Sequence, residues 1–282
     1  MSGLRLDLGC GFSKAEGTIG VDKVAGPGVD HVVDFETDRL PFADGSVEYI
    51  FSSHCLEHLG DPSLLFGEIS RVCQNGARLE LWTPYGWESS AFAFGHRTFY
   101  NEEHYLHMCV RFWNLWAAWL GARWVLQELV YIIEPATLME LYRQRIDLDF
   151  AVRYHKGVAW EFGVLIDVWR DFPGPEVPSR RSFSERRDAP RHPLPPIVHP
   201  AADVPADQLA EAIAWHASPS SDTRVGSVAA PHGLLLVGHL VRRVRAVARE
   251  EGLAQVARRT VSYAGTRIRR AAMNQQTVHW RT

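Results

Sequence analysis

Cysteine is scarce in this chain of 282 residues, and no long apolar run occurs. The cysteines, which form no CxxC pair, are Cys10, Cys55, Cys73 and Cys109. Their scatter argues against a disulfide framework or a zinc knuckle and suits a reducing compartment. No apolar run reaches about 18 residues without a charge, and the first residues lack the basic and apolar segments of an export signal. We therefore expect a soluble, cytoplasmic protein.

Lysine is nearly absent as well, since 27 of the 30 basic residues are arginine. The hydrophobic fraction of 46% and the aromatic fraction of 11% exclude a wholly disordered chain. The net charge of -3 results from opposite net charges in two parts of the chain. Residues 1–172 carry 14 basic and 24 acidic residues, a net charge of -10, whereas residues 173–282 carry 16 and 9, a net charge of +7.

Residues 1–172 alternate between apolar runs and helical patterns, which predicts an α/β domain. After the fourth run, Asp61-Pro62 opens a predicted helix, and Asn101 can cap a later one. The seven runs that we interpret as strands are 4–8, 18–21, 31–35, 49–52, 78–83, 123–133 and 158–169.

Composition changes after residue 172. Nine of the 16 prolines lie in residues 173–205, which excludes a helix or a central strand there. We interpret residues 173–235 as a proline-rich linker or an extended arm lying on the core. Helical periodicity with many arginines returns in the C-terminal region, residues 236–282.

Three successive predicted strands end in glycine or aspartate. The first, LRLDLGCG, ends in a D-x-G-x-G turn that lets the backbone approach a ligand. The second, TIGVD, ends at Asp22, whose carboxylate can accept both hydroxyls of a ribose. The third, HVVDFE, places Asp34 to accept an adenine amino group or another donor. A dinucleotide site needs a third glycine where Lys14 stands, so the pattern disfavours one.

These motifs, together with LPFADGSVEYIFSSHCLEHL and NGARLELWTP, resemble class I S-adenosylmethionine-dependent methyltransferases over residues 4–170. The spacing is most similar to a methyltransferase type 11-like bacterial branch that is often linked to glycan or cell-surface metabolism. The resemblance implies a Rossmann-like sheet of seven strands in the order 3-2-1-4-5-7-6, with the last strand antiparallel. We expect the proline-rich arm and C-terminal helices to follow it.

The resemblance also implies a site for S-adenosylmethionine. It places Asp7 and the glycine turn at the methionine moiety, Asp22 at the ribose, and Asp34 with Phe35 at the adenine. The stretch between Gly11 and Thr18 leaves room for at most one turn of helix, so Lys14 is an alternative partner for the methionine carboxylate. The expected cofactor-binding residues are Asp7, Gly9, Gly11, Lys14, Asp22, Asp34, Phe35 and Ser53.

Candidate catalytic groups follow the fourth predicted strand in SSHCLEHL. If a helix starts near His54, then His54, Glu57 and His58 share one face, because residues i, i+3 and i+4 are neighbours. A hydroxyl acceptor needs such groups to take its proton. Alternatively, Glu57 and His58 brace the helix. His96, in FAFGHRTFYNEEHY, is a further catalytic or acceptor-binding candidate, with Arg97 beside it.

A divalent metal is a further hypothesis. His54, Glu57, His58 and His96 resemble the E-x-x-E-H…H arrangement of certain metal-dependent RNA and quinone methyltransferases, with His54 in place of the first acid. Such nitrogen-rich ligands suit zinc, manganese or iron better than magnesium.

Aromatic residues cluster after the fifth predicted strand, where a sugar or planar acceptor could stack. The expected acceptor-binding residues are Trp82, Tyr85, Trp87 and Arg97. The leading hypothesis is therefore an O-methyltransferase acting on a small molecule or oligosaccharide: a sugar, a glycan or a glycosylated metabolite. The alternatives are an N-methyltransferase of an amino sugar or small natural product, and a catalytically silent binding module.

The arginine-rich tail suggests a second kind of contact. Nine arginines against two glutamates give residues 236–272 a net charge of +7. We expect this tail to contact the acidic core of its own subunit, a second subunit in a homo-oligomer, or an anionic membrane surface. No DNA partner is expected for the leading function. A nucleic-acid partner is expected only if the chain is a catalytically silent binding module.

Overall fold

The computed structural model describes residues 3–172, 178–197 and 205–217. The chain divides into two compact units, Met1–Pro200 and Ala201–Thr282, and each is described by itself. In the second unit the description covers the helix α6 (Ala206–Ala217). The basic helical region expected at 236–282, and the docking expected of it, lie outside the described residues. Within the described ranges, no helix has the length and apolar character needed to cross a bilayer.

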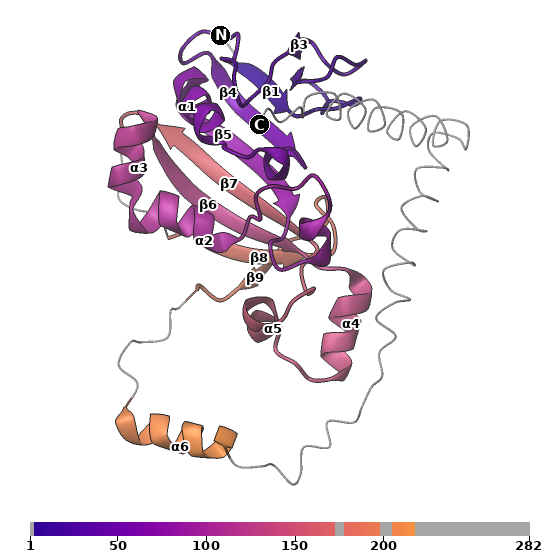
Figure 1. Cartoon of the computed structure of the whole chain (residues 1–282), viewed down its shortest axis with the longest axis vertical. Helices are drawn as coiled ribbons and strands as arrows, with labels where there is room; N and C mark the ends of the chain where they lie inside the picture. Colours follow the sequence, from indigo (N-terminus) through magenta and orange to yellow (C-terminus); the bar gives the residue numbers. More distant parts are fainter. Residues whose placement is uncertain (1–2, 173–177, 198–204, 218–282) are drawn as a thin grey trace, which may run out of the picture. The chain divides into compact units, whose positions relative to one another are not determined.

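The first unit is built on one mixed sheet (Figure 1), whose strand order is β3-β2-β1-β4-β5-β7-β6-β8-β9. The strands β1 to β5 run parallel to one another, whereas β7 lies antiparallel to both β5 and β6. The predicted order 3-2-1-4-5-7-6 is thus confirmed. The strands are β1 (Leu4–Leu8), β2 (Ile19–Asp22), β3 (His31–Val32), β4 (Val47–Ser53), β5 (Cys73–Pro84), β6 (Arg123–Ile132), β7 (Glu161–Trp169), β8 (Arg180–Ser184) and β9 (His192–Leu194).

The sheet register brings the expected site residues to one edge. Leu8 at the end of β1 pairs with Val21 on one side and with Ser52 on the other. Because parallel strands point the same way, the loops that follow β1, β2 and β4 meet at this edge. The short link from β1 to β2 contains no helix, as its length predicts.

Helices that follow β4 and β5 lie along the same side of the sheet (Figure 1). The helix predicted after Asp61-Pro62 is confirmed, and the Asp61 carboxylate accepts the Ser63 N–H at 2.9 Å. Asn101 caps α2 as predicted, since its side chain accepts the Glu103 N–H at 3.1 Å. The helices are η1 (Leu56–His58), α1 (Ser63–Val72), η2 (Ser89–Phe92), α2 (Glu102–Leu106), the π-helical turn η3 (His107–Arg111), α3 (Trp113–Leu120), α4 (Pro135–Arg143) and α5 (Leu148–Tyr154).

The main hydrophobic core lies between this helical layer and the sheet. Leu8 of β1 and Ile50 of β4 are fully buried against Leu65 and Ile69 of α1. Each buried side chain of this size stabilises the fold by about 1.5–3 kcal/mol. The core therefore fixes the strands whose ends form the candidate site.

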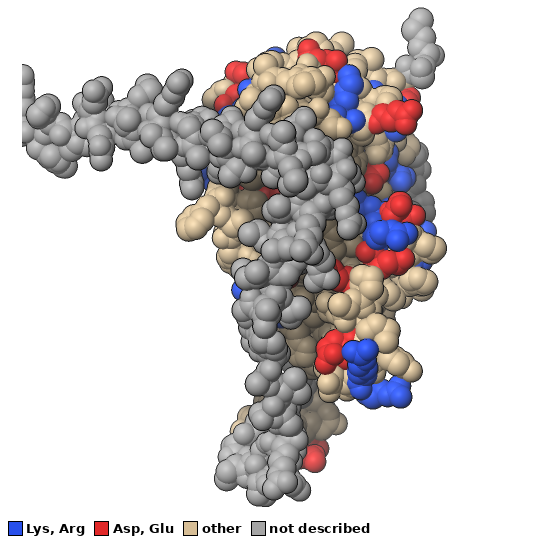
Figure 2. Space-filling model, turned by 90° about the vertical axis from the view of Figure 1, so that its right-hand side faces the viewer, with Lys and Arg blue, Asp and Glu red and all other residues tan. Residues whose placement is uncertain are grey.

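The opposite face of the sheet carries polar pairs beside a small apolar cluster of Trp82, Val130, Ile132 and Leu165. Glu80 accepts hydrogen bonds from the Tyr49 hydroxyl and the Trp82 indole, both at 2.8 Å. Parallel sheets usually bury both faces in apolar contacts. Here, pairing between strands satisfies the polar groups instead. Acidic and basic side chains also lie next to one another on the face that Figure 2 shows.

Residues 178–197, which we call the edge extension, add β8 and β9 beyond β6. Strand β8 pairs with β6 in parallel and with β9 antiparallel. The prediction that prolines exclude a central strand here is therefore wrong for Arg180–Ser184. This stretch contains no proline, so its N–H groups can complete both ladders. The boundary expected at residue 172 falls inside one compact unit.

Candidate functional site

The loop after β1 turns at two glycines with left-handed backbones. The φ angles are +77° at Gly9 and +58° at Gly11, which disfavour any side chain. A β-carbon at Gly9 would lie 2.3 Å from the Cys55 β-carbon, whereas one at Gly11 would meet nothing within 4 Å. Packing against the loop after β4 therefore requires Gly9, while backbone conformation alone accounts for Gly11.

Asp22, at the end of β2, holds this turn in place. Its Oδ2 accepts the Gly11 N–H and its Oδ1 accepts the Val24 N–H, both at 2.9 Å. Each carboxylate oxygen keeps a further lone pair, so the hydroxyls of a ribose can still donate to it. Asp22 lies beside the glycine turn, where the motif predicted it.

The expected adenine contacts lie after β3. Asp34 accepts the Glu36 N–H at 3.1 Å and pairs with Lys23 at 3.2 Å, and these contacts lower the pKa of Asp34. Phe35 is 4% exposed and its ring packs in the main core. The ring is thus not available to adenine, and a contact there would have to come from the Phe35 backbone.

A cavity of about 380 Å³ opens beside the glycine turn. Burial raises the pKa of Asp7, although its Oδ2 accepts the Ala15 N–H at 2.7 Å. The Lys14 ammonium pairs with Asp30 at 2.5 Å, and Lys14 as a partner for the methionine carboxylate stays a prediction. The cavity is lined by Asp7, Gly9, Cys10, Ser13, Lys14, Ala15, Phe51, Ser53 and Arg187.

His54 follows β4 in a left-handed conformation, with a φ of +53°, and its ring lies between two glutamates. Its Nε2 is hydrogen-bonded to Glu161 Oε1 at 2.6 Å, and its Nδ1 forms an ion pair with Glu57 Oε1 at 3.2 Å. Burial alone would lower the pKa of His54, but the two carboxylates outweigh it and raise the pKa to about 9. His54 is therefore cationic at neutral pH.

The predicted helix face with His54, Glu57 and His58 is not formed. The helix η1 begins only at Leu56 and is a single 3-10 turn, so the His54 backbone precedes it. The His54 N–H instead donates to the Trp82 carbonyl at 2.9 Å. Glu57 consequently lies between two groups, with His54 on one side and His58 on the other.

His58 and His96 form the second group, with ring centroids 4.9 Å apart. The Nδ1 atoms face the carbonyls of Gly95 at 3.2 Å and Ala91 at 3.0 Å, which favours protonated Nδ1 and an accepting Nε2. One ligand atom from each of Glu57, His58 and His96 lies within 4.8 Å of the others. Apart from the ion pair with His54, both Glu57 oxygens are buried with no hydrogen-bond partner among the described residues.

Two residues that the sequence did not single out as site residues complete the arrangement around His54. Glu161, the first residue of β7, is 0% exposed, and Arg187 of the edge extension donates to it through Nε at 2.8 Å and through Nη2. Arg187 Nη2 also donates to Ser53 Oγ at 2.9 Å. Burial alone would raise the pKa of Glu161, but Arg187 and His54 hold it below its ordinary value.

The aromatic acceptor platform needs correction. Trp82 and Tyr85 are each 1% exposed, because both lie at the carboxyl end of β5 within the packed sheet. Trp87 is 52% exposed, and Arg97 pairs with Glu36 at 3.3 Å. Two further exposed rings that the sequence did not single out, Phe92 and Phe99, stack with centroids 4.8 Å apart.

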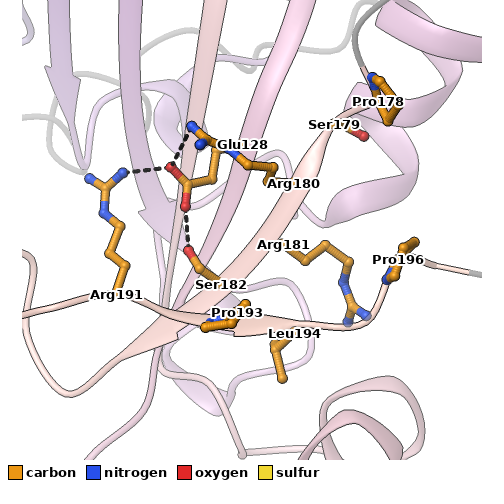
Figure 3. Close-up of a pocket in the computed structure, with 10 residues that line it drawn as sticks. All are labelled: Glu128, Pro178, Ser179, Arg180, Arg181, Ser182, Arg191, Pro193, Leu194 and Pro196. Atoms are coloured by element: carbon orange, nitrogen blue, oxygen red, sulfur yellow. Dashed lines mark hydrogen bonds and ion pairs between the residues drawn. The ribbon is translucent and has the colours of Figure 1, made fainter.

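A second cavity, of about 540 Å³, lies along the edge extension (Figure 3). Glu128 accepts from Ser182 at 2.6 Å and from Arg191 at 2.8 Å, while Arg181 points away towards Pro196 (Figure 3). Arg181 is bound to Asp149 at 2.6 Å. These contacts fasten the extension to β6 and to α5, and we assign no ligand to them.

The family comparison agrees with this geometry. Residues 10–81 match the family model described as a methyltransferase domain, and the stretch includes Gly11, Asp22 and β4. Over these residues the chain contains a methyltransferase domain.

Several solved structures are similar to this methyltransferase domain. An S-adenosylmethionine-dependent methyltransferase from Mesorhizobium loti shares 17% identity over 59% of this chain and 91% of its own, with a TM-score of 0.36. Geranyl diphosphate C-methyltransferase from Streptomyces coelicolor A3(2) shares 17% identity over 59% of this chain and 72% of its own, with a TM-score of 0.38. A SAM-dependent methyltransferase from Aquifex aeolicus shares 17% identity over 58% of this chain and 81% of its own, with a TM-score of 0.36. The comparison with curated proteins returns no match.

Proposed function

We propose that this chain is an S-adenosylmethionine-dependent O-methyltransferase that acts on a hydroxyl of a sugar, a glycan or a glycosylated metabolite. One chain of contacts carries the proposal. It runs from the cofactor cavity through Ser53 and Arg187 to Glu161, and from Glu161 to His54. The cavity and a titratable group suited to an acceptor proton are thus joined at one sheet edge.

The residues around the cavity fit the cofactor. Asp22 has carboxylate lone pairs for ribose hydroxyls, and Asp7 offers a buried carboxylate beside an open glycine turn. When bound, the cofactor supplies an electrophilic methyl group on its sulfonium. The chain therefore has to orient an acceptor and accept a proton from it.

His54 and its two carboxylates are the groups that we assign to the acceptor proton. Glu161 holds Nε2 at 2.6 Å, which fixes the ring orientation, and Glu57 faces Nδ1. Because the cationic ring has no free lone pair, the acceptor proton passes to the carboxylate of Glu57, which the ring holds in place. An amine acceptor can lose its proton to solvent beforehand, so a loss of transfer in His54→Gln would favour a hydroxyl acceptor.

The exposed aromatic residues after β5 support a sugar acceptor. Phe92 belongs to the same helix η2 as Ala91, whose carbonyl meets His96 at 3.0 Å. Phe92 is thus the next residue after a backbone partner of the second histidine group, and its ring stacks on Phe99. Flat apolar rings of this kind suit the C–H faces of sugars, and we assign acceptor binding to them and to Trp87.

Glu57, His58 and His96 also fit a divalent metal ion. A buried carboxylate without hydrogen-bond partners is costly unless a cation or donor joins it. Histidines that give Nδ1–H to a backbone carbonyl are typical of metal ligands that bind through Nε2. His54 is not in this set, because both of its nitrogens face glutamates. A zinc, manganese or iron ion would supply Lewis acidity at this position.

Metal content and binding test that assignment. We expect purified protein to hold about one equivalent of such an ion by elemental analysis, and Glu57→Gln to hold less than about a tenth of it. Glu140→Gln, on the exposed face of α4, is the matched control and should retain the metal. A metal-free wild type that also fails to bind zinc or manganese in calorimetry would exclude the ion.

Binding and turnover test the function. We expect calorimetry to detect binding of S-adenosylmethionine, and mass spectrometry to detect methylated product from a panel of paired hydroxyl and amino sugars. His54→Gln should lower transfer to hydroxyl acceptors about a hundredfold or more while leaving cofactor affinity within about threefold. His155→Gln, at an exposed position, is the control.

The alternatives predict different results. Transfer to amino acceptors alone, with His54→Gln fully active, would indicate an N-methyltransferase. Cofactor binding without transfer to any acceptor of the panel would favour a silent binding module.

A further inference from the structure

Arg187 is a cation that the edge extension brings into the cofactor cavity. It belongs to the turn between β8 and β9 and lines the same cavity as Asp7 and Ser53. Its guanidinium carbon lies 4.7 Å from the centroid of the Trp82 ring. Its Nε and Nη2 donate to Glu161 and Ser53. Three neighbours thus fix the plane of the guanidinium.

One end of this guanidinium is left for a ligand. Within the described part of the chain, no residue accepts a hydrogen bond from Arg187 Nη1. Glu161 itself cannot bind a ligand in the cavity, because it is buried beneath Arg187 and His54. Arg187 therefore combines a fixed orientation with a free donor, which is the arrangement that recognises a carboxylate.

The same cavity also holds the opposite charge. Asp7 is 3% exposed and uses Oδ2 to accept the Ala15 N–H, which leaves Oδ1 for another donor. The other cation at the cavity, Lys14, is already paired with Asp30 at 2.5 Å. A carboxylate and a guanidinium in one cavity complement the ammonium and carboxylate of an α-amino acid.

We propose that Arg187 of the edge extension binds the carboxylate at the amino-acid end of the cofactor, opposite the Asp7 side of the cavity where the resemblance already places the methionine moiety. The inference rests on the proposed use of S-adenosylmethionine and adds to it a residue outside the seven-stranded domain. Cofactor binding then depends on the edge extension. An isolated seven-stranded domain would lack the carboxylate partner.

Two ligands that differ only in the carboxylate test the proposal. We would titrate the full chain by calorimetry with S-adenosylmethionine and with decarboxylated S-adenosylmethionine. The wild type should bind the first at least about tenfold more tightly. Arg187→Gln should weaken S-adenosylmethionine by about tenfold to a hundredfold and change the decarboxylated ligand by less than about threefold.

Arg186→Gln is the matched control. Arg186 is the adjacent arginine, its side chain is 68% exposed and it pairs with Asp188. We expect this variant to bind both ligands as the wild type does. Thermal unfolding of each variant reports whether it is folded.

Each other outcome overturns a defined part of the reasoning. Equal binding of the two ligands by the wild type would refute carboxylate recognition even if Arg187→Gln does not fold. Equal weakening of both ligands in a folded Arg187→Gln would make Arg187 a purely structural residue. A folded wild type that binds neither ligand would refute the proposed function itself.

Discussion

Replacing Glu161 by glutamine should destabilise the protein and release His54 from its cationic state. Glu161 is 0% exposed and accepts hydrogen bonds from His54 at 2.6 Å and from Arg187 at 2.8 Å. Glutamine removes the negative charge and turns an N–H₂ group towards one of these donors. Removing one partner of a buried ion pair costs about 3–5 kcal/mol. The side chains of His54 and Arg187 are 30% and 32% exposed, so hydration recovers part of this, and we expect a loss of about 2–3 kcal/mol.

Two measurements check this prediction. Urea unfolding at pH 7 gives the free energy of unfolding of Glu161→Gln and of the control Glu140→Gln, which we expect within about 0.5 kcal/mol of the wild type. Nuclear magnetic resonance of the His54 ring protons gives its pKa. That value should fall from about 9 in the wild type towards the ordinary histidine value in Glu161→Gln.

The reasoning fails if Glu161→Gln is as stable as the wild type and the His54 titration does not move. Glu161 would then contribute nothing to the charge of His54. Loss of stability without a change in the His54 titration would assign the effect to Arg187 alone.

Three further predictions concern neighbouring groups. Asp22→Ala should weaken S-adenosylmethionine binding by about tenfold to a hundredfold in calorimetry, because charge-assisted hydrogen bonds contribute about 1.5–3 kcal/mol; an unchanged affinity in a folded variant would remove Asp22 from the site. Gly9→Ala should lower the free energy of unfolding by more than Gly11→Ala, about 2 kcal/mol or more against about 1 kcal/mol, because only the former places its β-carbon 2.3 Å from Cys55; equal losses would contradict the packing argument. Because the pKa of His54 is raised in the folded protein, its positive charge should stabilise the fold fully below about pH 6.5, and this stabilisation should disappear as the pH rises through about 9. The free energy of unfolding of chelator-treated protein should fall by up to about 3 kcal/mol over this range. An identical pH profile of stability in His54→Gln would refute this prediction.

The strand order came from the family resemblance, whereas the turns and helix starts could be predicted from the sequence because their signals are local. A glycine turn after β1 and an aspartate at the end of β2 each depend on a few neighbouring residues. Asp61-Pro62 likewise marks the start of α1 through the Asp61 side chain itself. Such contacts join residues that are close in sequence, and the structure confirms the elements that they predict.

The centre of the site could not be predicted in the same way, because its contacts link distant parts of the chain. His54 and Glu161 are 107 positions apart, and Arg187 lies 134 positions after Ser53. A weak signal existed: Glu161 interrupts an apolar strand, and a charge placed there needs a buried partner. Its cationic partner Arg187, however, lies in a proline-rich stretch, and the proline content did not predict the two short strands β8 and β9 there.

The edge extension is therefore part of both the sheet and the site. Its strand β8 covers the edge of β6, Arg191 and Ser182 hold Glu128 there, and Arg187 reaches Glu161. Without this segment, Glu128, which is 8% exposed, would lose Arg180 and Arg191, and Glu161, which is 0% exposed, would keep only His54. A buried carboxylate in that position has to take up a proton or draw in water, and either change alters the charge that Glu161 imposes on His54. The residues that form these contacts thus extend to Arg191, past residue 172 where the change in composition begins.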